Sequence, residues 1–321
     1  MLVFIEQGDN GIDDLSLQAL TFARSVVEQT ATPIEAVIGQ PLSDAAATAL
    51  RRQGVARLHV LRADVEGYAP AALARALAEL AQQRSAAVVL APSSDHGNEV
   101  LAHAAAILDQ PLATDVLSLT IGAPATVTRA RWGGSLIEHA ELSGEPLIVT
   151  LAAHSVEAHE VDAVEMEVVD FEATLSPLDK IVVAAKVQGE GSNSINLADA
   201  KVVVSGGRGV GSTEGFAVLE ELAELLGGAV GCSRVVTSAG WRPHTDQVGQ
   251  TGTKVAPDLY IACGISGATQ HLAGCRTSKT MLVINNDPEA SIMSHADYAV
   301  IGDLHTVLPA IVAEVRKAQA P

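Results

Sequence analysis

The chain has 321 residues, 48% hydrophobic and only 3% aromatic, so it can bury sizeable cores of Ala, Val, Leu and Ile. A formal net charge of −18 argues strongly against nucleic acid and anionic membranes as partners, because binding phosphates requires clustered Lys and Arg. The start, MLVFIEQGDN, is not typical of a secretory signal, and no stretch favours membrane insertion. We therefore expect a cytoplasmic protein. Its three cysteines lack metal-ligand spacing, which predicts buried thiols and no metal site.

The N-terminal part of the chain alternates between short apolar runs and stretches with helical spacing. The expected strands are Leu2–Glu6, Ile34–Gly39, Arg57–Arg62 and Ala86–Pro92. The expected helices are residues 13–29, 42–53, 69–83 and 97–108. This order predicts an α/β domain whose parallel sheet is covered by helices on both faces.

The alternation changes after residue 113. The next segments are TDVLSLTI, VTRARWGGSLIEHAEL and EPLIVTLAAH. Two apolar segments flank Gly133-Gly134, which indicates a hairpin and an antiparallel extension of the sheet. Residues 157–172 contain seven acids and no Lys or Arg, a pattern that we interpret as a solvated strand and connector.

A Gly-, Ser- and Asn-rich passage, VQGEGSNSINLADA, is the best candidate for a domain boundary. We place the boundary near residue 190. It separates an N-terminal α/β domain, residues 1–190, from a second domain, residues 191–321. We expect the first domain to serve as a scaffold and a subunit interface.

The second domain begins with a strand at Lys201–Ser205, a glycine-rich turn, and a helix expected from Ser212 to Leu226. Another strand is expected near Ser233–Thr237, and a closing helix from about His305 to Lys317. Between them lie three apolar runs that predict strands, LYIACG, KTMLVIN and ADYAVIG. Together these elements predict a Rossmann-like domain.

The glycine-rich turn GGRGVG, residues 206–211, is similar to a dinucleotide-binding fingerprint but departs from it. Ser212 occupies the position of the third glycine, and no acid follows the second strand to bind a ribose. A plain NAD site is therefore weakly supported, and a tight turn without a ligand stays an alternative. A helix N-terminus beside glycines and Arg208 nevertheless suits a phosphate or an adenine diphosphate.

Further polar loops follow the expected strands of this domain. They are Ser233-Arg234, the loop 246–252, the turn Gly264–Gly267 with His271, Asn285, and Asp303. Because ligands of open α/β sheets lie outside the carboxyl ends of the strands, we expect these loops to converge on one crevice. A large, flat, phosphate-bearing ligand fits this set better than it fits any single loop.

The second domain closely resembles the alpha subunit of electron transfer flavoprotein, the FixB family. The motifs that carry the resemblance are SGGRGVGS, CSR, QVGQTGTKVAPDLYIACGISGATQHLAG and SKTMLVINNDPEA, in order and spacing over residues 200–317. The first domain is similar more loosely, through its opening strand and the RWGGSLIEHAEL segment. The resemblance implies FAD bound between this domain and a partner beta subunit. It also implies a dehydrogenase as electron donor and a membrane quinone oxidoreductase as acceptor.

The resemblance also implies roles for individual residues. Arg208 and Ser266 would contact the pyrophosphate or adenosine side, Thr251 would lie near flavin N5, and His271 near O2. The complete expected set of cofactor-binding residues is Arg208, Ser233, Arg234, Val248, Gly249, Gln250, Thr251, Ser266, Gly267, Ala268, Thr269, Gln270, His271, Asn285, Asp303 and Leu304. No catalytic residue of independent substrate chemistry is expected.

One-electron reduction puts negative charge on N1 and O2 of the flavin, so a positively charged or donating His271, with Arg234, would favour the anionic semiquinone over the oxidised form. An electron carrier is therefore the leading hypothesis. One alternative is a flavin- or nicotinamide-dependent oxidoreductase with its own small substrate. Another is a nucleotide-binding regulatory or scaffold protein without redox use.

Overall fold

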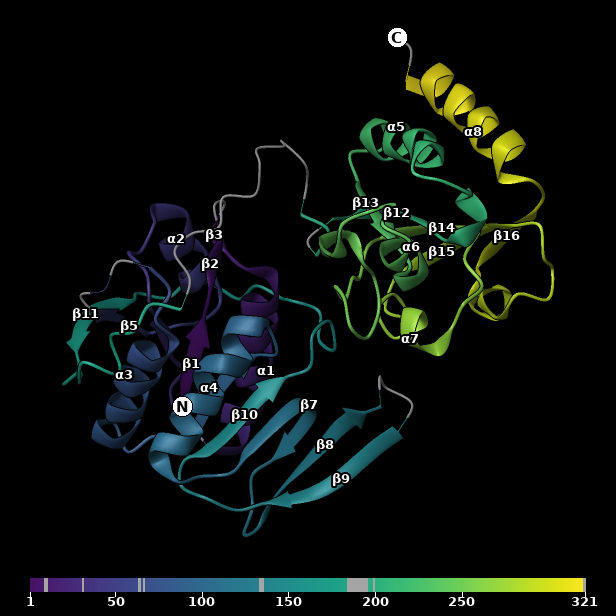
Figure 1. Ribbon diagram of the computed structural model, residues 1–321. Helices are drawn as coiled ribbons and strands as arrows, with labels where there is room; N and C mark the ends of the chain where they lie inside the picture. Colours follow the sequence, from purple (N-terminus) through teal and green to yellow (C-terminus); the bar gives the residue numbers. More distant parts are fainter. Residues whose placement is uncertain are drawn as a thin grey trace. The chain divides into compact units, whose positions relative to one another are not determined.

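In the computed structural model the chain forms two compact units, Met1–Glu190 and Gly191–Pro321, which we describe separately (Figure 1). The structure describes residues 1–8, 11–30, 32–62, 65, 67–132, 136–183, 196–198 and 200–319. Most of the passage in which we predict the domain boundary lies outside these residues, so the boundary stays a prediction.

The first unit is built on one large sheet. Within its described residues the strand order is β11-β5-β4-β1-β6-β10-β7-β8-β9. The strands are β1 Leu2–Ile5, β4 Glu35–Ile38, β5 Arg57–Arg62, β6 Val88–Pro92, β7 Leu112–Thr120, β8 Ala125–Arg131, β9 Leu136–Leu142, β10 Leu147–Leu151 and β11 Glu167–Glu172. Pairing is parallel from β11 to β7 and antiparallel from β7 to β9, which confirms the predicted extension. A short hairpin, β2 Gln7–Gly8 and β3 Gly11–Ile12, follows β1.

Helices cover both faces of this sheet because its central strands are apolar on both sides. Val3 and Ile5 of β1 belong to one core with α1 Asp14–Thr30 and α2 Asp44–Arg52. Leu2 and Phe4, which point the opposite way, belong to a second core with α3 Pro70–Gln83 and α4 Asp95–Leu108. The side chains of Ser43 and Ser94 cap α2 and α4 by accepting hydrogen bonds from backbone N–H groups. The prediction of a parallel sheet covered on both faces is confirmed.

The acidic segment forms the edge strand β11, paired in parallel with β5. Two of its acids, Glu167 and Glu172, lie opposite Arg57 and Arg62 of β5. Arg57 is 2.6 Å from Glu167, and Arg62 is 2.8 Å from Asp170. The predicted solvated strand is therefore confirmed, and charges along it protect the sheet edge.

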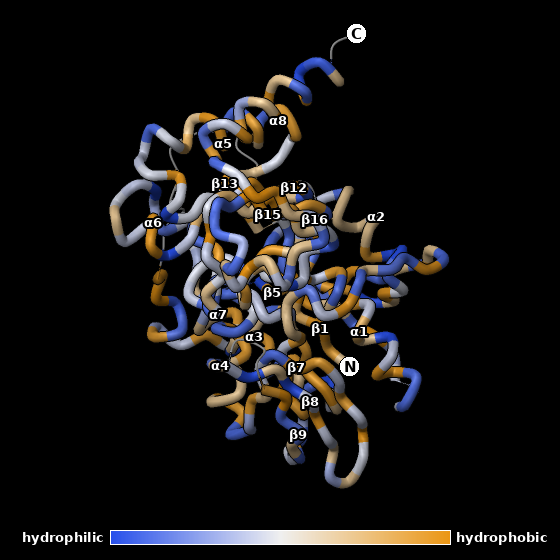
Figure 2. The backbone as a smooth tube through the Cα atoms, turned by 90° about the vertical axis from the view of Figure 1, so that its right-hand side faces the viewer, coloured by the Kyte–Doolittle hydropathy of each residue, from blue (hydrophilic) through white to orange (hydrophobic). Residues whose placement is uncertain are grey.

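The second unit contains a parallel sheet whose described strands follow the order β13-β12-β14-β15-β16. They are β12 Val202–Gly206, β13 Ala229–Cys232, β14 Leu259–Cys263, β15 Thr280–Asn285 and β16 Tyr298–Ile301. Its helices are α5 Ala217–Leu225, α6 Arg234–Ser238, α7 Thr269–Leu272 and α8 Leu304–Gln319. Helices α5 and α8 alternate between hydrophobic and hydrophilic stretches, as helices that cover one side of a sheet do (Figure 2). This architecture is the predicted Rossmann-like domain.

Two local predictions in this unit are wrong. The strand expected at Ser233–Thr237 is instead helix α6, because β13 ends at Cys232 and the carbonyl of Ser233 accepts hydrogen bonds from the N–H groups of Val236 and Thr237. The helix expected from Ser212 begins at Ala217. Two short 3-10 turns, Arg208–Val210 and Glu214–Phe216, precede it. Gly211 lies between them with φ +89°, a conformation that interrupts a helix.

Candidate functional site

A cavity of about 790 Å³ lies at the carboxyl ends of the strands of the second unit. The loops after β12, β13, β14 and β15 all contribute to its wall. Twelve of the sixteen residues predicted from the sequence line it: Arg208, Ser233, Arg234, Val248, Gly249, Gln250, Thr251, Ser266, Ala268, Gln270, His271 and Asn285. The convergence of these separate loops follows from the parallel sheet, which brings the carboxyl ends of all its strands to one edge.

Two glycine-containing turns meet backbone to backbone at the base of this cavity. The N–H of Gly207 donates to the carbonyl of Cys263 at 2.8 Å, and that of Gly209 to the carbonyl of Gly264 at 3.1 Å. A Cβ atom on Gly207 would lie only 2.3 Å from the Gly264 oxygen. Only residues without side chains allow this approach, which leaves the rims of both turns open to a ligand.

Arg208 and Arg234 line the cavity, and neither forms an ion pair with a described residue. Arg242, outside the cavity lining, is by contrast bound to Glu220 and Asp246. Two unpaired guanidinium groups beside a glycine-rich turn suit an anionic ligand such as a pyrophosphate.

The loop after α6 is held by a buried amide that the sequence analysis did not single out. Gln247, 2% exposed, accepts a hydrogen bond from Thr237 Oγ1 at 2.8 Å and donates to Thr251 Oγ1 at 3.0 Å. Because the Thr251 oxygen accepts from Gln247, its own proton stays available to a ligand. The loop is also fixed to α7, since the N–H of Gln250 donates to the carbonyl of Gln270 at 2.7 Å.

His271 is the most buried ionisable group in the lining. It is 6% exposed, and its Nε2 lies 2.8 Å from the hydroxyl of Tyr260, which is fully buried. Burial lowers the pKa of His271 to about 4, against an opposing effect of the Val248 carbonyl, so the imidazole is neutral at pH 7. Its Nδ1 is buried and forms no well-aligned hydrogen bond with the described part of the chain, although the Val248 carbonyl lies close enough to the ring to raise its pKa. A buried polar atom without a well-aligned partner beside a cavity suits a ligand.

Tyr260 is a residue that sequence reasoning missed. It lies in the apolar strand LYIAC, where a tyrosine is expected to contribute only its ring to the core. Its hydroxyl could have indicated a role beyond packing, because a buried tyrosine oxygen requires a hydrogen-bond partner.

Asn285 lines the cavity, but both ends of its amide are engaged within the protein. Its Nδ2 donates to the carbonyl of Ile265 at 2.9 Å, and its Oδ1 accepts from the N–H of Asp287 at 3.1 Å. It thereby ties the end of β15 to the turn after β14. Asp287 and Asn286 join the lining without having been predicted.

Four predicted residues lie outside the lining: Gly267, Thr269, Asp303 and Leu304. Asp303 accepts hydrogen bonds from His305 and Thr306 at the start of α8. Leu304 is buried in the core behind the turn at Gly264, and Gly267 packs against the backbone of Ile292.

The three cysteines are free and buried, as predicted, and burial raises the pKa of each thiol to about 12. Among the described residues, no group of three His, Cys, Asp or Glu side chains is placed to bind a metal. The described helices include none with the length and apolar character needed to cross a bilayer.

Comparisons with known proteins match both units. The family "Electron transfer flavoprotein domain" matches residues 1–176, and "Electron transfer flavoprotein FAD-binding domain" matches residues 196–276. The electron transfer flavoprotein subunit alpha of Mycobacterium leprae is 36% identical over 310 residues, 96% of this chain and 95% of its own. That of Thermoanaerobacterium thermosaccharolyticum is 32% identical, with 98% and 97% covered. Protein FixB of Clostridium saccharobutylicum is 31% identical, with 98% and 96% covered.

Proposed function

Because this chain belongs to the family of electron transfer flavoprotein alpha subunits, we propose that it carries electrons, together with a beta subunit, from a dehydrogenase to a membrane quinone oxidoreductase. Its second unit is the FAD-binding domain of the family. The observation that carries the proposal is the convergence of twelve predicted residues on one cavity that holds two unpaired arginines.

The residues present fit FAD. Arg208 and the turn at Gly264–Ser266 would hold the pyrophosphate, and the loop Val248–Thr251 with Arg234 would line the flavin ring. Bound FAD supplies the one- and two-electron redox chemistry, and the protein orients and tunes it. No ionisable acid or base of the protein is required to act on a substrate.

His271 would act as a neutral donor rather than as a cation. Burial raises the pKa of Tyr260 well above 10, so its hydroxyl keeps its proton and can donate it to Nε2 of His271. The ring proton then stays on Nδ1, and this N–H is available to a flavin carbonyl oxygen. A hydrogen-bond donor at that position favours negative charge on the flavin ring system, which is the role expected of His271 from the sequence. Tyr260 is thus a positioning residue for His271.

Co-expression with the beta subunit tests the proposed function. We expect a yellow heterodimer with one FAD in this site, reduced by a purified dehydrogenase and reoxidised by a quinone oxidoreductase. A colourless complex would exclude the proposal, as would direct turnover of a small substrate without any protein acceptor.

Tyr260→Phe provides a sharper test of the site. We expect FAD to stay bound while its midpoint potential falls by an amount equivalent to about 1 kcal/mol, the net value of one hydrogen bond. The reason is that the proton of His271 can move to Nε2 once the tyrosine hydroxyl is gone. The potential is measured by spectroelectrochemistry, and Tyr298→Phe, at an exposed tyrosine of β16, serves as the matched control. An unchanged potential in Tyr260→Phe would remove Tyr260 from the mechanism.

A further inference from the structure

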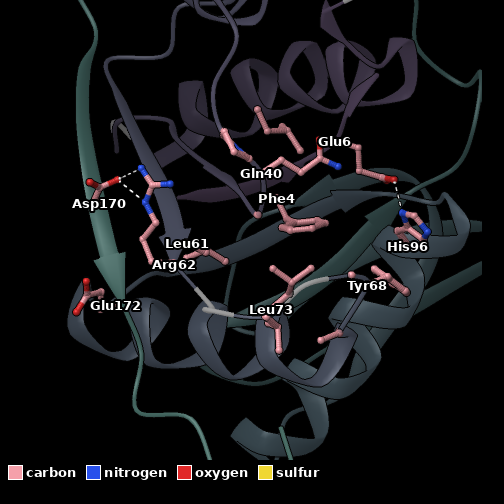
Figure 3. A pocket seen from close by; sticks show the side chains of 16 residues that line it. Phe4, Glu6, Gln40, Leu61, Arg62, Tyr68, Leu73, His96, Asp170 and Glu172 are labelled. Atoms are coloured by element: carbon pink, nitrogen blue, oxygen red, sulfur yellow. Dashed lines mark hydrogen bonds and ion pairs between the residues drawn. The ribbon is translucent and has the colours of Figure 1, made fainter. Parts of the chain in front are cut away.

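The first unit contains a separate cavity of about 830 Å³ that the proposed electron transfer does not use (Figure 3). It lies at the carboxyl ends of β1, β4 and β5. The chain leaves β1 for β4 and β5 on one side and then returns to β6 on the other side of β1. The loops after β1 and β6 therefore diverge, and such a point is where open α/β sheets place ligands.

One end of this cavity is a carboxylate already surrounded by donors. Glu6 follows β1, accepts a hydrogen bond from the Ser94 hydroxyl, and lies 3.2 Å from Nδ1 of His96. Ser94 and His96 belong to the start of α4, so Glu6 supplies the negative charge that a helix N-terminus favours. A phosphate at this place would be repelled by Glu6. A carboxylate has room for further hydrogen bonds, so a hydroxyl donor would be accepted.

The other end of the cavity is also acidic. Asp170 and Glu172 line it, and Arg62, the one arginine among the described lining residues, is bound to Asp170 at 2.8 Å. Among the described lining residues, three carboxylates face one guanidinium and one imidazole. This balance disfavours a phosphorylated ligand and favours an uncharged one that carries hydrogen-bond donors.

The middle of the cavity is apolar. Phe4, Leu61 and Leu73 lie between the two polar ends, and Gln40 and Glu6 stand to one side of the Phe4 ring with Leu73 to the other (Figure 3). Gln40 is exposed, and its amide makes no hydrogen bond with the described residues. Apolar side chains of this kind offer contact to a planar ring, and a free amide can pair with both a donor and an acceptor on the edge of that ring.

We propose that this cavity binds an unphosphorylated nucleoside. Its base lies in the apolar middle of the cavity and is recognised by the amide of Gln40, and its ribose hydroxyls donate to Glu6. The cavity volume lies within the range of about 300–1,000 Å³ that is common for small-molecule sites.

Calorimetric titration of the FAD-loaded complex with adenosine, AMP and 2′,3′-dideoxyadenosine tests this site. We expect adenosine to bind, and AMP and the dideoxy compound to bind about tenfold more weakly or worse. AMP adds a charge beside carboxylates, and dideoxyadenosine lacks the hydroxyls that Glu6 accepts. No adenosine binding, or tighter binding of AMP, would overturn the proposal.

Two variants locate the site within the chain. Glu6→Gln should remove most of the preference for adenosine over dideoxyadenosine. Removing the carboxylate from the protein and removing the ribose hydroxyls from the ligand both break the same hydrogen bonds, so the two effects should not add. Gln40→Ala should weaken adenosine binding about tenfold. Because Gln40 is exposed, this substitution should leave folding unchanged. Glu141→Gln, at an exposed acid of β9, is the matched control and should change nothing. Adenosine binding that is unaffected by both Glu6→Gln and Gln40→Ala would also overturn the proposal.

Discussion

Gly264→Ala is expected to weaken FAD binding at least a hundredfold and to destabilise the second unit by about 2–6 kcal/mol. Gly264 has φ +61°, which a side chain rarely adopts. A Cβ atom there would also lie 2.7 Å from Cα of Gly209 and 2.8 Å from Cδ1 of Leu304. The first contact is with backbone, so relief requires the two turns that border the cavity to separate. FAD content after purification and denaturant unfolding of the complex measure both effects.

The chain offers a matched control for this substitution. Gly227 has nearly the same backbone conformation, φ +62°, but nothing lies within 4 Å of the position of its Cβ. Gly227→Ala therefore isolates the cost of the conformation, about 1 kcal/mol, and should leave FAD binding unchanged. If both variants behaved alike, the close contact between the turns would not be what shapes the site.

Most strands of both sheets were predictable because they are apolar runs bounded by Gly, Pro or charged residues, but β13, Ala229–Cys232, was placed too late in the sequence. Helix α6 was not, because Val235 and Val236 are β-branched and favour a strand. Ser233 still donates its N–H to the Gly206 carbonyl of the neighbouring strand, while its own carbonyl already accepts from the N–H of Val236, so the sheet ends and the helix begins at this residue. Such a long-range contact leaves no trace in the local pattern.

The location of the candidate site, like most of the strands, was predictable from the sequence. Loops at strand ends could be placed on one edge from the parallel topology alone, and most of their residues line the cavity. Which atoms are free for a ligand could not be predicted. Asn285 has the residue type of a ligand-binding amide, yet its two polar atoms bind Ile265 and Asp287. Tyr260 has the pattern of a core residue, yet it contacts His271.

The residues that line the cavity of the first unit were even harder to predict from the sequence. Glu6 and Arg62 each follow or end an expected strand, but Asp170 reaches the cavity only because β11 pairs with β5. These strands are far apart in sequence, and nothing in their periodicity predicts that they are neighbours. The acidic segment was therefore interpretable as solvated but not as part of a binding site.

The stability of the second unit is expected to depend on pH through His271. Its pKa is about 4 when folded and ordinarily 6.5, so as pH falls the unfolded chain takes up a proton before the folded one does. Stability from this group is complete above pH 6.5, is lost between pH 6.5 and 4, and changes no further below. The full loss is about 3 kcal/mol, since each pKa unit corresponds to about 1.4 kcal/mol.

Urea unfolding of the FAD-free chain, followed by tryptophan fluorescence, measures this dependence. The chain has two tryptophans; Trp132 is 81% exposed and changes its surroundings little, so the signal reports mainly on Trp241 in the second unit. In His271→Gln we expect the loss of stability between pH 7.5 and 4.5 to shrink by most of those 3 kcal/mol, because no group at this position titrates. His295→Gln, at an exposed histidine, should retain the wild-type dependence. An equal dependence in His271→Gln and wild type would mean that the imidazole is not held neutral by burial, and its proposed role as a neutral donor to the flavin would fail with it.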